Sequence, residues 1–550
     1  FRNVPKVAAL PNFDGGVAKL GFAPGGYRIT ITAKGVSVLG EYGPANGVGE
    51  SRGLRMGLRR LADLAFVKNG KLHLPTGTIE DWPSVPSRGV HLFVGPVAGP
   101  FQRRLWDRVL LPLGMDRVVL QCERAEWDAL PNLRGGDAMP KKALGELFDW
   151  YRSKEVEAIP LVQSIGHAEW IFRGDKNLDL AVNPKVPYSI DPRNPKAQDL
   201  IAKIWREAIA LSKPKIVHFG LDEIDMRGFP AGAEGEELAT ELWEKQLPFL
   251  NAIAKGAGAV PMLWGDMALH KSEAPDATNA PDVATAKRRR AAIPKGAYIA
   301  DWHYKNDPKA STFYPVLQLW KREGFRPVAS AWFRPENVRG FNLAADLEGV
   351  GALQTTWAGY ESNETSLLEN AAQFSAMVLA ADYGWSARQD EVAKLPYDPM
   401  EELRRRLYAE PAPVSPRSGR SLSWGETDPL VANGYSWRVH REPIRIADPL
   451  TGVGLRSVTL PNAKGKLRLL VRAPGVRDGG GALARIAEGT RTKPILYGRH
   501  ARSAEDQGVA LLGDRSGDFW VVEFELRGEP ARIESFGPVG GLEIHAASIE

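Results

Sequence analysis

The sequence predicts an α/β protein built around a (β/α)8 TIM barrel, with a small α/β domain before the barrel and a β-rich domain after it. Eight short apolar runs alternate with longer helical segments across residues 87–397, as parallel strands joined by helices do. A strand-and-helix pattern precedes this region, and alternating segments between Gly and Pro turns follow it. We therefore expect three domains, at residues 1–86, 87–397 and 398–550.

The barrel strands are expected to begin near residues 88, 116, 157, 215, 260, 297, 327 and 351, with helical stretches such as DLIAKIWREAIALS between them. Before the barrel, GYRITITAKGVSVLG predicts a strand and hairpin, SRGLRMGLRRLADLA predicts a helix, and the Pro-rich EDWPSVPSRG predicts a hinge. After the barrel, KLRLLVRAP, DFWVVEFELRG and GLEIHAASIE predict a sandwich-like accessory domain. That domain could buttress the barrel or bind carbohydrate, and the sequence leaves both roles open.

The composition is that of a packed globular protein, because 550 residues with 43% hydrophobic and 25% charged side chains supply a large core. The net charge is +5, and the only dense basic run, Lys287-Arg288-Arg289-Arg290, is expected in a solvated loop. We therefore expect no nucleic-acid partner. No apolar run reaches the roughly 18 residues that a membrane-spanning helix needs.

A single cysteine, Cys122, excludes an intramolecular disulfide and a cysteine-based zinc cluster. The chain begins at Phe1 rather than Met and shows no signal peptide, which is consistent with a processed or trimmed product. We expect an extracellular or periplasmic location, and the sequence predicts no oligomeric state.

Polar and aromatic side chains follow the predicted strands at their C-terminal ends, where barrels of this kind build their active sites. Tryptophan offers a flat apolar face with one polar edge, which suits the face of a pyranose ring, and carboxylates bind its hydroxyls. A single strand-end tryptophan is more often core filler, but four strand ends share the pattern. The sequence therefore predicts a sugar site among these strand-end residues: Gln121, Glu123, Gln163, His167, His218, Asp222, Glu223, Trp264, Asp266, Asp301, Trp302, Tyr304, Trp332, Trp357 and Glu361.

Two adjacent carboxylates in VHFGLDEIDMRG, Asp222 and Glu223, follow the fourth predicted strand. Taken alone, such a pair is usually a helix cap or a surface turn. In a confined pocket, like charge and desolvation raise the pKa of one carboxyl. The carboxyl with the raised pKa is then a serviceable acid, and the other stabilises positive charge. Neighbouring residues in extended backbone point in opposite directions, so both can face one substrate only if the chain bends after Gly220.

The order of motifs from about residue 25 to residue 364 resembles glycoside hydrolase family 20, the β-N-acetylhexosaminidases. After a strand-and-helix prelude, TIEDWPSVPSRG is similar to the family's hinge with Arg-Gly opening the barrel. SIGHAEW stands where the family has Pro-Gly-His after strand three, with Ile in place of Pro. HFGLDE matches the H-x-G-x-D-E signature after strand four, which is the most specific motif. MLWGDMA, WHY and QTTWAGYE follow in the family's order.

The resemblance implies a retaining, substrate-assisted mechanism, which is an exception to the usual two-carboxylate scheme. Glu223 would protonate the glycosidic oxygen and later act as base towards water. Asp222 would hold the N–H of the substrate's 2-acetamido group, so that the acetamido oxygen attacks the anomeric carbon and forms an oxazolinium intermediate. The enzyme would need no protein nucleophile and no cofactor or metal.

The resemblance also implies contacts with the terminal sugar. Arg88 would fork onto the 3- and 4-hydroxyls, a bidentate task that suits guanidinium, although a salt bridge in the hinge is the alternative. Glu361 would accept from the 4- or 6-hydroxyl, and His167 would orient Asp222 or a neighbour. The other substrate-binding residues would be Trp264, together with Trp302, Trp332 and Trp357 as walls of the ring and acetamido pocket and Tyr304 as donor to the acetamido oxygen.

The sequence departs from the family pattern at two places. VHLFVGPVAGPF replaces an Asp and an Arg-His pair after Arg-Gly, and QCERAEW replaces the H-x-x-D stretch after strand two. These departures leave the sugar open between N-acetylglucosamine, N-acetylgalactosamine and a substituted hexosamine, carried by an oligosaccharide or glycoconjugate.

Two other functions stay open. One is a catalytically silent, carbohydrate-binding relative of the family, against which the intact Asp-Glu pair argues. The other is a metal-dependent hydrolase that uses His167, His218, Asp222 and Glu223 as ligands. Nine histidines without an H-E-x-x-H motif argue against the metal enzyme.

Overall fold

The computed structural model describes residues 13–41, 52–68, 71–135, 137–360, 362–363, 366–367 and 370–408. In the C-terminal part it describes residues 420–422, 427–432, 435–440, 443–446, 457–460, 462–472, 480–489, 491–498, 509–510, 520–535 and 542–549. The chain divides into two compact units. One holds the described residues between 8 and 362 together with 372–399, and the other holds those of 363–371 and 400–550.

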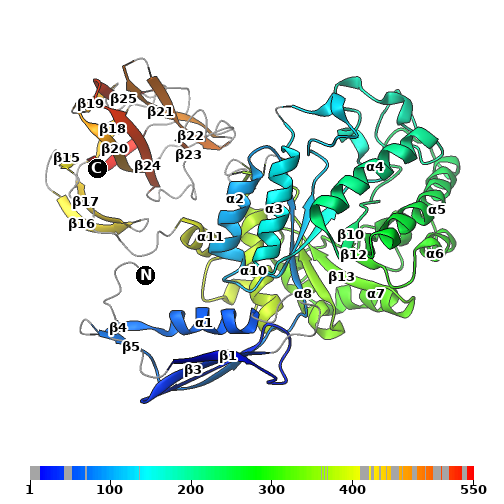
Figure 1. Ribbon diagram of the computed structural model, residues 1–550, viewed down its shortest axis with the longest axis horizontal. Helices are drawn as coiled ribbons and strands as arrows, with labels where there is room; N and C mark the ends of the chain where they lie inside the picture. Colours follow the sequence, from blue (N-terminus) through cyan, green and yellow to red (C-terminus); the bar gives the residue numbers. More distant parts are fainter. Residues whose placement is uncertain are drawn as a thin grey trace. The chain divides into compact units, whose positions relative to one another are not determined.

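A four-stranded sheet opens the first unit, with α1 (Arg52–Leu64) packed on it (Figure 1). The strand order is β1 (Phe13–Ala18), β3 (Gly35–Glu41), β2 (Tyr27–Thr32) and β6 (Gly77–Asp81). Alternation along β2 turns Tyr27, Ile29 and Ile31 into a core that Leu61 of α1 completes. A small hairpin, β4 (Phe66–Lys68) with β5 (Lys71–His73), follows α1. The predicted strand, hairpin and helix of this region are confirmed.

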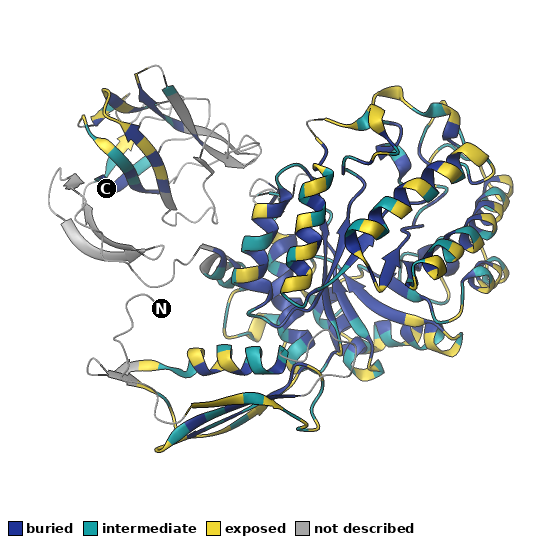
Figure 2. Ribbon diagram, viewed as in Figure 1, coloured by how far each residue is buried: buried dark blue, intermediate teal, exposed yellow. Residues whose placement is uncertain are grey.

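Eight parallel strands form a closed barrel in which each strand pairs with the next in chain order and the last pairs with the first. All eight predicted strands are confirmed. Their buried side chains fill the barrel interior, and Figure 2 shows the strands as the most buried part of this unit. The strands are β7 (Arg88–Phe93), β8 (Arg117–Gln121), β9 (Glu157–Leu161), β10 (Ile216–His218), β11 (Val260–Trp264), β12 (Tyr298–Trp302), β13 (Arg326–Ala331) and β14 (Gly351–Gln354).

Helices surround the barrel, with buried inner faces and exposed outer faces (Figure 2), as amphipathic helices on a parallel sheet do. Two of them begin with caps that their sequences supply: Asn194 accepts from the backbone N–H of Lys196, and Asp282 accepts from that of Thr285. The helices are α2 (Ala98–Leu105), α3 (Lys141–Ser153), α4 (Pro195–Ser212), α5 (Ala233–Gly256), α6 (Val283–Ala292), α7 (Ala310–Arg322), α8 (Pro335–Glu348) and α10 (Ala371–Ser386).

The basic run at 287–290 lies in helix α6, so the prediction of a solvated loop is wrong. Arg289 and Arg290 are fully buried. Arg289 pairs with Glu236 at 3.2 Å and Arg290 with Glu273 at 2.9 Å. The run therefore ties α6 to neighbouring elements of the barrel, and its two buried arginines donate to carboxylates and to backbone carbonyl oxygens.

The second unit contains α11 (Pro399–Tyr408) and a β-rich region, and the prediction of a β-rich C-terminal part is confirmed. One sheet holds β15 (Arg420–Leu422), β26 (Leu542–Ile549), β20 (Lys464–Arg472) and β24 (Trp520–Arg527), with β18 (Ile444–Ile446) also on β26. Another holds β19 (Ser457–Leu460), β25 (Ala531–Ser535), β21 (Gly480–Glu488), β22 (Arg491–Gly498) and β23 (Val509–Ala510). β16 (Thr427–Ala432) and β17 (Tyr435–His440) form a hairpin. Within the described parts of the chain, no helix is apolar and long enough to cross a bilayer.

Candidate active site

The chain bends sharply after β10, as the sequence analysis required. Gly220, Leu221 and Glu223 all have positive φ, at 72°, 75° and 47°, in the left-handed region that L-residues seldom occupy. Gly220 is needed for a second reason, because a Cβ there would overlap the side-chain oxygen of Gln163. The bend lets Asp222 and Glu223 face the same imidazole although they are neighbours in the chain.

Gln163 holds the bend and the carboxylate of Asp222 together. Its side-chain oxygen accepts from the backbone N–H of Leu221 at 3.1 Å, and its Nε2 donates to Asp222 Oδ1 at 2.7 Å. Both Gln163 and Asp222 are buried. Asp222 therefore has a fixed orientation, with Oδ1 already engaged.

His167 lies between the two carboxylates. Its Nε2 is 3.2 Å from Glu223 Oε2 and 3.5 Å from Asp222 Oδ2. Burial by itself lowers the pKa of His167, but the charge of Asp222, together with the hydrogen bond to Glu223 and its charge, outweighs burial and raises the pKa to about 9. At neutral pH the ring is an imidazolium that donates to the pair, as the predicted orienting role requires.

A third carboxylate, Asp266, lies behind the pair and was given no role by the sequence analysis. Its Oδ2 accepts from the backbone N–H of Glu223 at 3.0 Å, and its Oδ1 accepts from Trp302 Nε1 at 3.0 Å. Burial, with the charge of Asp222 added, raises the pKa of Asp266 to about 7. Asp266 thus fixes the backbone of Glu223, and its place two residues after the end of β11, among the strand-end residues, was its signal in the sequence.

Burial also raises the pKa of Asp222, with the charge of Glu223 acting in the same direction and His167 and Gln163 opposing it. The sequence argument expected a raised pKa on one carboxyl of the pair and left open which one. In the structure burial raises the pKa of Asp222, whose side chain is 9% exposed.

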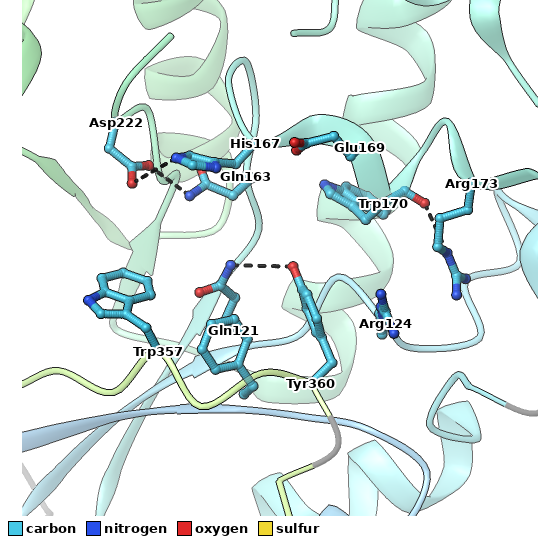
Figure 3. Close-up of a pocket in the computed structure, with 11 residues that line it drawn as sticks. Gln121, Arg124, Gln163, His167, Glu169, Trp170, Arg173, Asp222, Trp357 and Tyr360 are labelled. Carbon is cyan, nitrogen blue, oxygen red and sulfur yellow. Dashed lines mark hydrogen bonds and ion pairs between the residues drawn. The ribbon is translucent and has the colours of Figure 1, made fainter. Parts of the chain in front are cut away.

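A pocket of about 340 Å³ opens beside Asp222 (Figure 3), within the range of small-molecule sites. Asp222, Gln163 and His167 lie at one end of it, and Arg124 and Arg173 at the other. The full lining is Phe93, Gln121, Arg124, Gln163, His167, Glu169, Trp170, Arg173, Asp222, Trp357 and Tyr360.

The predicted aromatic walls form one connected group. Trp357, which lines the pocket, donates from Nε1 to the hydroxyl of Tyr304 at 3.0 Å. The ring of Tyr304 packs against Trp302 at 4.9 Å and Trp332 at 5.1 Å between ring centroids. The structure therefore brings these four side chains together beside the carboxylates, as an apolar wall with a hydroxyl in it.

Arg88 does not reach the pocket, and the prediction that it binds sugar hydroxyls is wrong. It is the first residue of β7, about 16 Å along the strand from Phe93. Its side chain is 1% exposed. It donates to the carbonyl oxygens of Gly114 and Val85 and to Asp116 Oδ2, at 2.7 to 3.0 Å. Arg88 is the hinge salt bridge that the sequence offered as the alternative.

Trp264 and His218 are fully buried in the barrel interior. Their rings pack against each other at 4.6 Å, and Trp264 lies under Trp357 at 5.8 Å. Trp264 therefore supports the wall and has no surface for a ligand, so its predicted contact with substrate is wrong. His218 does not belong to the cluster of His167, Asp222 and Glu223. Glu361 lies outside the described residues.

His167, Asp222 and Glu223 are also a possible metal-binding group, since one potential ligand atom from each lies within 4.8 Å of the others. A ligand histidine must be neutral, and the raised pKa of His167 shows that the two carboxylates already favour its protonated form. A divalent ion would displace that proton. The arrangement is complete as a hydrogen-bonded set without one.

No family model matches the sequence. Among solved structures, the GH20 β-N-acetylhexosaminidase from Streptomyces coelicolor A3(2) matches with a TM-score of 0.52 over 74% of this chain and 86% of that chain, at 16% identity. The barrel has the fold of glycoside hydrolase family 20. A mutant Streptomyces plicatus β-hexosaminidase in complex with its product GlcNAc matches with a TM-score of 0.50 over 71% and 80% of the two chains, at 17% identity.

Within the curated proteins, Hexosaminidase D from Homo sapiens is 23% identical over 206 residues, which are 35% of this chain and 39% of that protein. The chain thus spans about two fifths of the length of this relative. The likeness to these solved structures shows the family-20 fold. The low identities show that the chain is a divergent example of that fold. The predicted (β/α)8 barrel, with a small α/β domain before it and a β-rich part after it, is confirmed.

Proposed function

We propose that the protein is a glycoside hydrolase, and specifically a retaining exo-glycosidase that removes terminal β-linked N-acetylhexosamine, GlcNAc or GalNAc, by substrate-assisted catalysis. The observation that carries this proposal is the cluster of His167, Asp222 and Glu223 at the end of β10, beside a pocket walled by Trp357. The names of the matched proteins, hexosaminidases and β-N-acetylglucosaminidases, support the same substrate class.

In the first step Glu223 donates its proton to the glycosidic oxygen, and the bond from that oxygen to the anomeric carbon breaks. The substrate's acetamido oxygen attacks the same carbon from the opposite face and forms the oxazolinium ion. Asp222 accepts the acetamido N–H and balances the positive charge that develops on this group. Glu223, now a carboxylate, takes a proton from water, which opens the ring and restores the β-configuration.

The spacing of the carboxylates supports retention. One oxygen from each carboxylate and one nitrogen of His167 lie within 4.8 Å of one another. An inverting enzyme separates its two carboxyl groups by roughly 6.5–9.5 Å to admit a water. The nearest oxygens of Asp222 and Glu223 are closer together than this, and Gln163 holds Asp222 in one orientation.

The test is hydrolysis of aryl β-N-acetylglucosaminide, β-N-acetylgalactosaminide and β-glucoside by the wild type, Glu223→Gln and Asp222→Asn. The wild type should cleave the N-acetyl substrates and leave the glucoside intact, because glucose has no acetamido group. Glu223→Gln should lose about 10² to 10⁴ in rate with a poor leaving group and much less with a good one. Asp225→Asn, a change in the same loop, serves as the control and should keep its activity.

Each rival function has its own outcome in the same experiment. A silent carbohydrate-binding protein would bind N-acetylhexosamine without cleaving any of the substrates. A metal enzyme using His167, Asp222 and Glu223 would lose activity to a chelator and regain it with a divalent ion. Cleavage of the glucoside at a comparable rate would rule out substrate assistance.

A further inference from the structure

The two stretches that depart from the family pattern meet in one hydrogen-bonded unit behind the pocket. His91 comes from VHLFV in β7, and Gln121 and Glu123 come from the QCERAEW stretch at the end of β8. All three side chains are buried, at 4% exposure or less. His91 Nε2 lies 2.8 Å from the Gln121 side-chain oxygen, and Gln121 Nε2 donates to Glu123 Oε1 at 3.2 Å.

Glu123 connects this row to the wall of the pocket. Its Oε1 accepts from the backbone N–H of Gln163 at 3.0 Å, and its Oε2 accepts from the hydroxyl of Tyr360 at 3.2 Å. Gln163 in turn donates to Asp222. We call His91, Gln121, Glu123, Gln163 and Tyr360 the Glu123 network. Figure 3 shows Gln121, Gln163 and Tyr360 facing the pocket.

The donors and acceptors of the Glu123 network determine how many protons it holds. The carbonyl oxygen of Thr356 lies 2.9 Å from His91 Nδ1 and can only accept, so Nδ1 carries a proton. With the Gln121 oxygen facing His91, Nε2 must also carry a proton, and the ring is an imidazolium. If the Gln121 amide is turned by half a rotation, its NH2 group donates to a neutral His91. The Gln121 oxygen then faces Glu123 Oε1, and that contact requires a proton on Glu123.

Both arrangements contain the same number of protons. A neutral His91 together with an ionised Glu123 satisfies neither orientation of Gln121, because two acceptors then face each other at 2.8 or 3.2 Å, too close to admit a water between them. Such a contact is unfavourable in a buried site. The network therefore keeps one proton more than the usual ionisation states of His and Glu would give it near neutral pH.

Burial decides where that proton lies. It lowers the pKa of His91 to about 4, despite the hydrogen bonds to Gln121 and Thr356. It raises the pKa of Glu123 to about 7, despite the hydrogen bonds from Gln163, Tyr360 and Gln121. A neutral imidazole with a protonated carboxyl is thus the favoured arrangement.

We propose that Glu123 is a positioning residue that works as a neutral carboxylic acid. Losing its proton leaves two acceptors facing each other at the contact with Gln121, which shifts the carboxyl to which Gln163 and Tyr360 donate and so disturbs Asp222. The kinetic consequence rests on the proposed function, whereas the protonation of Glu123 does not. The groups that face the network are Cys122 beside Glu123, Asp222 in contact with Gln163, Arg124, which lies over the ring of Tyr360 at 4.6 Å, and His218 near His91. None of them supplies a cation in contact with the Glu123 carboxyl.

The protonation is tested on the full chain by carbon NMR of ¹³C-glutamate-labelled protein between pH 5 and 9. The wild type should show a carboxyl resonance that titrates near pH 7 and that is absent from Glu123→Gln. Nitrogen NMR should show His91, assigned with His91→Phe, as a neutral ring protonated on Nδ1 at pH 7. A Glu123 carboxyl already ionised at pH 6, or a His91 imidazolium at pH 7, overturns the proposal. Neither measurement requires catalytic activity.

The positioning role is tested with an aryl N-acetylglucosaminide that has a good leaving group, for which the proton of Glu223 matters little. The wild-type kcat/KM should fall by roughly threefold or more between pH 7 and 8.5. Glu123→Gln, which cannot ionise, should be slower but flat over that range, and Glu123→Asp should keep the decline. Asp266→Asn removes the other carboxyl with a pKa near 7 and should also keep it. A decline that persists in Glu123→Gln and disappears in Asp266→Asn refutes the role of Glu123.

Discussion

Replacing Arg88 with Met separates the structural role of this arginine from the sugar-binding role that the family resemblance implies. The change keeps an unbranched apolar stem against Gly384 and removes the guanidinium that contacts Gly114, Val85 and Asp116. Removing one partner of a buried ion pair costs about 3–5 kcal/mol. In the variant the Asp116 carboxylate still accepts from the backbone N–H of residue 88, at 2.9 Å, and still pairs with Arg52, at 3.1 Å. We therefore expect a loss near the lower limit, about 3 kcal/mol of unfolding free energy.

The assay is guanidinium unfolding of the first unit, combined with KM for an aryl N-acetylglucosaminide at a temperature where the variant is folded. KM should stay within about twofold of the wild type. Arg88 does not reach the pocket, so the folded variant keeps every contact with the substrate. Arg288→Met is the control, since Arg288 forms its ion pairs with Glu237 and Glu244 at the surface. It should change the unfolding free energy by less than about 1 kcal/mol. A tenfold rise in KM for Arg88→Met with unchanged stability would refute the structural assignment.

Two further predictions concern the carboxylate cluster and the bend that presents it. The pKa of His167 is raised to about 9, so its ion pairs stabilise the fold fully below pH 6.5 and lose this effect as the pH rises through 9. The stability difference between the wild type and His167→Gln should therefore shrink by about 1–2 kcal/mol over that range, after allowance for solvent screening of a side chain that is 33% exposed. Gly220→Ala should cost about 2–4 kcal/mol and about tenfold or more in kcat/KM, because it adds left-handed strain and a clash with Gln163. Gly174→Ala, at φ 64° in open space, should cost only about 1–2 kcal/mol and leave kcat/KM unchanged.

Urea or guanidinium unfolding at several pH values, with kinetics on the same preparations, measures both effects. A stability difference for His167→Gln that is constant from pH 6 to 9.5 would show that the ring does not carry its charge in the folded state. Equal losses of stability in the two glycine variants would show that φ, and not the close approach to Gln163, is what Gly220 provides.

The barrel could be predicted because its evidence is local: eight apolar runs at the right spacing, each followed by polar or aromatic residues. The pairing of Asp222 with His167 could be anticipated for the same reason, since both follow neighbouring strands. The error at Arg88 came from motif matching alone. A residue at the start of a strand lies at the opposite end of the barrel from the strand's C-terminal end, and that geometry was already in the sequence.

The partners of the side chains could not be predicted, because they depend on the register between strands and on backbone bends that no local pattern encodes. Gln163 holds Asp222 only because Gly220 brings the following loop close to β9. The meeting of His91 with Gln121 depends on the pairing of β7 with β8. Trp264 ends a strand and Trp357 follows one, yet the first is buried in the barrel interior and the second lines the pocket.

The hidden carboxyl groups of Glu123 and Asp266 have a different role from those of Asp222 and Glu223, which act on the substrate in the proposed mechanism. Glu123 and Asp266 lie behind Gln163 and Glu223, and burial raises the pKa of each to about 7. A proton on each of these two carboxyls keeps them from adding negative charge behind the residues that act on the substrate. An oxazolinium ion forming beside Asp222 then meets a carboxylate that Gln163 and His167 hold in one orientation, so the negative charge lies where the positive charge develops. Ionising Glu123 would add negative charge to a buried site and disturb the residues that hold Asp222, which is why activity should fall on the alkaline side even with a substrate that does not need the proton of Glu223.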